Sequence, residues 1–322
     1  MPQTPPETPK EPQSASAGRP ESPGTAGAGG AEEPAAPAGG TGVADGPTAP
    51  DTRDTPDAGP GDADRVVLPE PGPGEPRGLV PDTIRQIAGR ATLPFHATRP
   101  ELSFATAFWY NDLIETGGDH EVIRQYLVTA AHRTRYETGQ WTLRPELADP
   151  EQPVDELVMG GFMKRWTAFP TLGVAVMPTV DMHLHAERKS WRWATQEITE
   201  GLAARAEDIA AIVAEPLPAY ILGHTAEGGG RRPARHQHLL EGAVSRPDPE
   251  GRMQWSGPEL PDGFDGAPVF AALELPDEQL KLLCLGAIVP GGPPTVATFD
   301  LLRPAVHALA PPRTRHWWQR RR

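Results

Sequence analysis

The chain has 322 residues and a formal net charge of −13, with 40 prolines, 34 glycines and one cysteine, Cys284. This length allows two domains. A single cysteine excludes intramolecular disulfides and a thiolate metal cluster, and it fits a reducing cytoplasm. The sequence has no run of 18 uncharged apolar residues and no apolar signal region at its start. We therefore expect a cytoplasmic protein without a transmembrane segment.

The first quarter of the chain differs in composition from the rest. There is no Phe, Tyr or Trp between Met1 and Pro94, and residues 1–80 hold 13 acidic and 5 basic side chains, which account for −8 of the net charge. So little apolar area cannot offset the entropy lost on ordering. We predict a disordered, acidic, Pro/Ala/Gly-rich tail over residues 1–90, and its charge says nothing about a substrate.

The remaining sequence has the pattern of strands. Short segments rich in β-branched and aromatic residues are separated by turn residues. Eight strands are predicted, at 91–98, 102–110, 126–130, 140–144, 174–177, 219–222, 269–273 and 282–289. Leu, Ile and Val at helical spacing after acidic residues predict one or two short helices within 195–214, and a further helix is predicted over 298–309. The pattern is typical of an all-β domain with one linking helical segment and a terminal helix.

Three motifs, in this order along the chain, resemble those of the trypsin-like (chymotrypsin-fold) serine proteases. The segment YLVTAAHRT is similar to the strand plus TAAH that presents the catalytic histidine, and His132 takes that position. The segment WTAFPTLGVAVMP is similar to the one that supplies the triad aspartate, where Gly173 stands. The segment GFDGAPVF is similar to the nucleophile motif GDSGGPVF, with Asp265 in place of the serine.

The resemblance covers residues 91–312. It implies a peptidase domain of two packed, six-stranded, antiparallel β-barrels, at about 91–194 and 215–312, with a C-terminal helix. The absence of disulfides makes the chain similar to the intracellular bacterial members of the family.

The substitutions in the motifs remove most of the catalytic chemistry. Acyl transfer on this scaffold needs a neutral hydroxyl, a histidine, a carboxylate that orients the histidine, and two N–H groups for the oxyanion. Of the three catalytic side chains the sequence keeps only His132, because Gly173 has no side chain and an ionised Asp265 has no proton to give. The resemblance implies an oxyanion hole formed by Gly263 and Asp265, and an ion pair between His132 and Asp265. It also places Glu259 near the base of the primary specificity pocket, where a carboxylate would favour basic residues.

The sequence thus predicts a catalytically inactive homologue, a pseudoprotease, which binds a peptide or protein partner and uses no cofactor. Two alternatives stay open. One is an active peptidase or hydrolase with a non-standard nucleophile, for which Ser256 is the nearest candidate. The other is a scaffold that acts through its disordered tail.

Two further stretches have both a functional and a structural interpretation. Asp181, His183 and His185 would share one side of a strand, as metal ligands can, but no further ligand is evident, so we predict an exposed connection and no metal site. The Gly-, Arg- and His-rich stretch 223–238 lacks the GK[ST] ending of a phosphate-binding loop, and a structural loop is predicted.

The segment Arg313–Arg322 combines Trp317 and Trp318 with a cluster of arginines. Such a segment can contact nucleic acid or an anionic membrane. It can equally pack its tryptophans on the folded domain, and both interpretations stay open.

Overall fold

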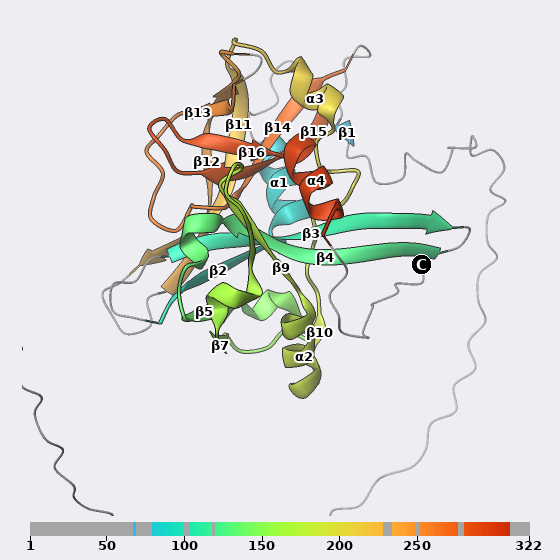
Figure 1. Cartoon of the computed structure of the whole chain (residues 1–322), viewed down its shortest axis with the longest axis vertical. Helices are drawn as coiled ribbons and strands as arrows, with labels where there is room; N and C mark the ends of the chain where they lie inside the picture. Colours follow the sequence, from blue (N-terminus) through green and yellow to red (C-terminus); the bar gives the residue numbers. More distant parts are fainter. Residues whose placement is uncertain are drawn as a thin grey trace, which may run out of the picture. The chain divides into compact units, whose positions relative to one another are not determined.

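The computed structural model describes residues 67–68, 79–98, 104–117, 120–227, 234–248, 251–275 and 280–309. The main elements are two seven-stranded sheets whose paired strands are all antiparallel (Figure 1). A third, two-stranded sheet joins β6 (Ala148–Asp149) to β10 (Arg192–Trp193). Among these residues, no helix combines the length and the apolar character needed to cross a bilayer.

The first sheet forms around a set of large apolar side chains. Its order is β7-β5-β2-β3-β4-β9-β8. The strands are β2 (Thr92–Ala97), β3 (Phe104–Gly117), β4 (His120–Ala130), β5 (Thr138–Leu143), β7 (Asp155–Gly160), β8 (Thr167–Phe169) and β9 (Val174–Pro178). In β5 the side chains alternate between half-buried and buried, and this puts Trp141 and Leu143 in the core beside Phe95. Such alternation is what a strand with one covered face requires.

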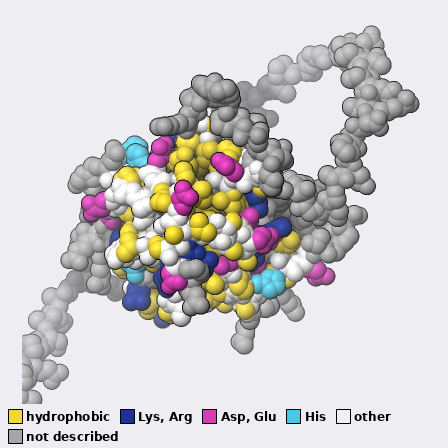
Figure 2. Space-filling view, turned by 90° about the horizontal axis from the view of Figure 1, so that it is seen from above, with side chains coloured by type: hydrophobic (Ala, Val, Ile, Leu, Met, Phe, Trp, Pro, Cys, Tyr) yellow, Lys and Arg dark blue, Asp and Glu magenta, His cyan; other side chains and the backbone are white. Residues whose placement is uncertain are grey.

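The second sheet closes on itself. Its order is β1-β15-β14-β11-β12-β13-β16, and an additional pairing of β15 with β16 joins six strands into a ring. The strands are β1 (Val67–Leu68), β11 (Leu217–Glu227), β12 (Ala234–Ser245), β13 (Met253–Ser256), β14 (Pro268–Glu274), β15 (Leu280–Val289) and β16 (Thr295–Thr298). Ile221, Leu283 and Ile288 fill the ring. Figure 2, which looks down on the end of the molecule that carries this sheet, shows apolar surface interrupted by acidic side chains.

A third apolar cluster joins the two sheets. It combines Phe108 of β3 and Val128 of β4 with Phe270 of β14 and Leu282 of β15. The helices α1 (Leu79–Ala88) and α4 (Phe299–His307) pack on it, while α2 (Val180–Arg188) and α3 (Ala206–Ala211) lie between the two sheets in sequence. This shared core fixes the first sheet against the second, and the candidate site contains residues from both.

The structure confirms the eight predicted strands, a short helix within 195–214 and the terminal helix, and it corrects four other expectations. The folded part starts before residue 91, because α1 buries Ile84 and Ala88 in the shared core. Most of the predicted tail, like Arg313–Arg322, lies outside the described residues. The first sheet has seven strands, where six were expected, while the second has six strands in its ring with the short β1 added beside β15. Residues 223–227 and 234–238 belong to β11 and β12 and do not form a loop.

Two observations concern helices. Of the one or two short helices predicted within 195–214, one is present, at Ala206–Ala211. Before it the backbone pairs with neighbouring strands, since Ile198 N–H donates to Trp109 and Ala204 N–H donates to Cys284. These tertiary hydrogen bonds outweigh local helix propensity. Conversely, the predicted exposed connection after β9 is the helix α2, with Met182, His185 and Ala186 buried.

Candidate functional site

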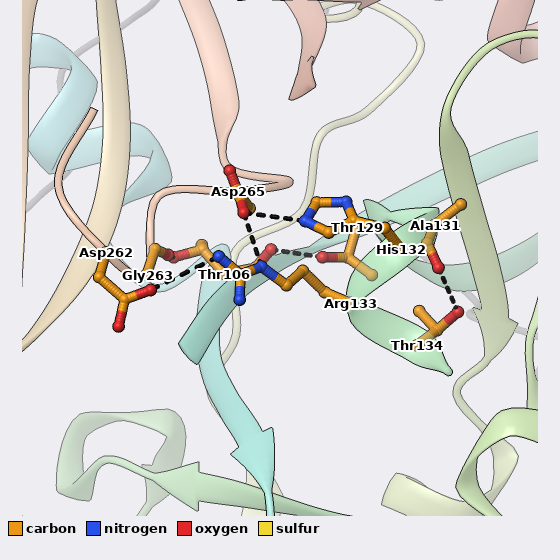
Figure 3. Close-up of polar contacts among 9 residues, drawn as sticks. All are labelled: Thr106, Thr129, Ala131, His132, Arg133, Thr134, Asp262, Gly263 and Asp265. Carbon is orange, nitrogen blue, oxygen red and sulfur yellow. Dashed lines mark hydrogen bonds and ion pairs between the residues drawn. The ribbon is translucent and has the colours of Figure 1, made fainter. Parts of the chain in front are cut away.

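The expected contact between His132 and Asp265 is present. His132 lies in a short 3-10 helix, Ala131–Thr134, directly after β4, and Asp265 lies in the turn that precedes β14. The distance from Nε2 of His132 to Oδ2 of Asp265 is 3.0 Å (Figure 3). The histidine side chain is 41% exposed and the aspartate side chain 12%. The two sheets therefore meet at one histidine and one carboxylate that solvent can reach.

An arginine, which sequence reasoning missed, binds the same carboxylate oxygen as His132. Nε of Arg133 donates to Oδ2 of Asp265 at 2.6 Å, and its guanidinium also lies 3.5 Å from Oδ1 of Asp262. Partial burial raises the pKa of Asp265, but the hydrogen bonds from His132 and Arg133 outweigh it and hold that pKa below its usual value. Asp265 is therefore ionised near neutral pH. The available signal was an arginine directly after the histidine and two aspartates three residues apart.

Asp262 forms the outer edge of this cluster. Its side chain is 58% exposed. The pKa of Asp262 is raised, mainly because the side chain is partly buried and also because the Asp265 charge is near. The Arg133 guanidinium and a hydrogen bond from the Gly263 backbone oppose this rise. The backbone N–H of Gly263, expected in an oxyanion hole, thus already faces a carboxylate.

Thr106 of β3 anchors the turn that carries Asp265. Its hydroxyl donates to the carbonyl of Gly263 at 2.7 Å, and its N–H donates to the carbonyl of Asp265 at 3.1 Å. Gly263 has a φ of +101°, and a Cβ at this position would stand 2.1 Å from the carbonyl oxygen of His224. Only glycine therefore suits this position. The anchored backbone directs the Asp265 side chain toward His132 and Arg133.

Gly173 lies beside the histidine turn and contributes backbone alone. Its carbonyl accepts the N–H of Ala131 at 2.8 Å. Its φ is +78°, and a Cβ would lie 2.7 Å from Cγ1 of Val289. The turn between β8 and β9 therefore requires glycine for structural reasons, because a side chain here meets both backbone strain and a steric contact.

The remaining predicted residues lie apart from this cluster. Glu259 is exposed in the segment between β13 and β14. Ser256 is exposed on β13, and its hydroxyl lies 3.4 Å from the carbonyl of Ala243. On α2, Nε2 of His183 lies 3.0 Å from Oε1 of Gln125, and Nε2 of His185 lies 3.3 Å from Oδ2 of Asp155. In the part of the chain that the structure describes, no three His, Cys, Asp or Glu side chains are grouped so as to hold a metal ion.

No family model and no curated protein matches the sequence. Solved structures do show similarity. An HtrA-type protease, AlgW, with a tripeptide matches at 14% identity and a TM-score of 0.35, over 70% of this chain and 63% of that one. Rv3671c from M. tuberculosis, in an inactive mutant form, matches at 13% identity and a TM-score of 0.35, over 73% and 96% of the two chains. Catalytically inactive tobacco etch virus protease with substrate matches at 6% identity and a TM-score of 0.38, over 68% and 83%. This chain spans 62% and 63% of the length of the two HtrA-type protease chains it matches.

Proposed function

We propose that this chain is a chymotrypsin-like protein of two β-barrels, that it has no serine-protease activity, and that it binds a peptide or protein partner around His132. The observation that carries the proposal is the carboxylate of Asp265, held 3.0 Å from Nε2 of His132 and 2.6 Å from Nε of Arg133. A serine protease needs a hydroxyl at this place.

The chemistry of the cluster opposes acyl transfer. An ionised Asp265 has no proton for His132 to remove, and its negative charge would repel a developing oxyanion. Gly173 offers no carboxylate to orient the imidazole. Two of the hydroxyls drawn in Figure 3 are also engaged, since Thr106 donates to Gly263 and Thr129 donates to the carbonyl of Thr106 at 2.7 Å.

A fluorophosphonate probe tests the absence of activity. We expect no labelling of the full chain at neutral pH under conditions in which an active serine hydrolase is labelled completely. Asp265→Ser should also stay unlabelled, because no carboxylate orients His132 in that variant. Labelling of the wild-type chain that survives Ser256→Ala would show another nucleophile, and labelling lost in that variant would identify Ser256; either result contradicts the proposal.

The proposed ligand is a peptide segment with a basic side chain. His132 and Asp262 are accessible to solvent, and Asp262 gives this surface an acidic edge, to which we propose that Glu259, exposed three residues earlier in the chain, contributes. Charge complementarity favours a cationic partner and suppresses anionic ones. The double variant Glu259→Gln/Asp262→Asn should therefore lose binding to Lys- and Arg-containing peptides in an array.

A matched control is available elsewhere on the surface. Glu187→Gln/Glu215→Gln removes the same charge from two exposed positions on other segments and should leave peptide binding unchanged. Equal loss in both double variants would mean that only net charge matters, which contradicts a specific site.

We also propose a cytoplasmic location, because the one cysteine, Cys284, is fully buried and free; fractionation of the native cell tests it.

A further inference from the structure

The ribbon formed by β3 and β4 extends past the rest of the first sheet. Strand β2 pairs with β3 only as far as Phe108, and β9 pairs with β4 only from Tyr126 onward. Beyond these residues β3 and β4 pair with each other out to Gly117 and His120, as a long two-stranded arm (Figure 1). A two-stranded ribbon alone is at best marginally stable in water. The arm therefore needs a cover on one face.

Helix α4 covers the inner part of one face. At its start, the ring of Phe299 lies 5.0 Å from that of Tyr110, measured between centroids. At its end, Nδ1 of His307 lies 3.3 Å from Oδ1 of Asp112. Tyr110 and Asp112 are successive residues on the same face of β3. The helix thus runs along this face toward the tip of the arm.

Arg124, which stands opposite Asp112 in the ribbon, holds the chain as it leaves α4. Its guanidinium donates to the carbonyls of His307 at 2.9 Å and Leu309 at 2.6 Å. The next side chain on this face of β4 is the half-buried Val122. A bulge in β3 inserts Ile114, also half-buried, as an extra residue between Leu113 and Glu115, and Glu115 is the residue that pairs with Val122. An apolar pair therefore lies directly ahead of the chain that leaves Leu309.

We propose that residues 310–322 of this chain continue along the same face and pack Trp317 and Trp318 on Ile114 and Val122. Thirteen residues follow Leu309; they span up to about 43 Å when extended, and the apolar pair is only about 7 Å further along the ribbon. Tryptophan combines a large apolar area with one polar N–H, which suits a half-buried site. The exposed Glu115, beside Ile114, offers a carboxylate to the arginines of the segment. The arm and the C-terminal segment thus stabilise each other.

Hydrogen exchange on the full chain tests the proposal in both directions. Trp317→Ser/Trp318→Ser should make the amides of residues 111–125 exchange severalfold faster, because the cover of the arm is lost. Val122→Glu should in turn speed exchange of residues 313–322. Ile123→Glu, on the opposite face of the same strand, is the matched control and should leave exchange in residues 313–322 unchanged. Exchange in the β14–β15 pair reports whether each variant is folded.

The other occupants of this face are separate outcomes. Exchange rates that stay the same in the arm and in residues 313–322 for all variants overturn the proposal. Protection of the arm that increases with protein concentration would assign the face to a second copy. Protection that appears only with phosphatidylserine vesicles or with RNA would assign the tryptophan segment to that ligand, and either result would also overturn the proposal.

Discussion

Two aspartates in this protein each lie beside a histidine and an arginine, but their pKa values are shifted in opposite directions. Asp265, on the turn before β14, is hydrogen-bonded through Oδ2 to Nε2 of His132 at 3.0 Å and to Nε of Arg133 at 2.6 Å. Its pKa is lowered, although burial alone would raise it.

Asp112, on the β3–β4 arm, is more deeply buried, with a side chain 2% exposed. Nδ1 of His307 lies 3.3 Å from Oδ1, and the Arg124 guanidinium lies 3.1 Å from Oδ2 without hydrogen-bond geometry. The N–H groups of Arg124 point to the carbonyls of His307 and Leu309 instead. Burial therefore prevails, and the pKa of Asp112 is raised.

The comparison shows that the same three residue types do not shift the pKa of an aspartate in the same direction. A short, directed hydrogen bond from arginine at a partly hydrated site lowers the pKa of Asp265, whereas a nearby arginine engaged elsewhere leaves Asp112 to its desolvation. Four experiments break or sharpen this comparison.

The largest expected effect comes from removing each arginine. Arg124→Met should lower the free energy of unfolding by about 3–5 kcal/mol, because it leaves a buried acid without its cation and the end of α4 without a donor. Arg133→Met should cost about 1–2 kcal/mol, because Asp265 keeps His132 and contact with water. Urea denaturation near neutral pH measures both, and adding Asp112→Asn to Arg124→Met should restore part of the loss. Equal costs for the two arginines would break the comparison.

The next effect concerns the glycine beside the histidine turn. Gly173→Ala should destabilise the fold by about 1–3 kcal/mol, because its φ is positive and a Cβ meets Val289. Gly160→Ala is the control, since a Cβ at Gly160 meets nothing within 4 Å; its cost should stay within about 0.5 kcal/mol. Thermal unfolding of both variants measures the difference, and a neutral Gly173→Ala would show that this turn is free to rearrange.

These results also show what the sequence does and does not reveal. Strands such as β14 and β15, and the contact of His132 with Asp265, were predictable because motifs and apolar runs are local signals. The helix α1 was missed because its ten residues follow a long stretch dominated by Pro and Gly, and only two of them, Ile84 and Ala88, are fully buried in the shared core. Arg133 was missed because its role depends on the distance to Asp265, 132 residues away in the chain. Long-range partners of this kind have no local pattern.

A third experiment follows the opposite pKa shifts. The folded-state pKa of Asp265 lies below its usual value of 3.8, so its stabilisation is present above that pH and is lost as the pH falls through the folded value. For Asp112 the sign reverses, and stability falls as the pH rises from 3.8 through the raised folded value. Asp265→Asn should remove the first dependence and Asp112→Asn the second, as measured by urea unfolding across the acid range. The same pH profile in both variants would contradict the assignment.

The smallest effect is expected at the outer edge of the site. Asp262→Asn removes an ion pair of 3.5 Å to Arg133 at a position that is more than half exposed. Such pairs contribute little, so the free energy of unfolding should change by less than about 0.5 kcal/mol. A loss above about 1 kcal/mol would mean that Arg133 needs both aspartates to hold its place.

During synthesis of the chain, the two partners of the His132–Asp265 contact are made at different times. The two residues are 133 positions apart, one following β4 of the first sheet and the other preceding β14 of the second. At about 5–20 residues per second, a ribosome that has just added His132 needs on the order of ten seconds to reach Asp265. During that interval His132 and Arg133 are without the carboxylate that binds them in the finished protein, so this contact forms only after the turn before β14 has been synthesised.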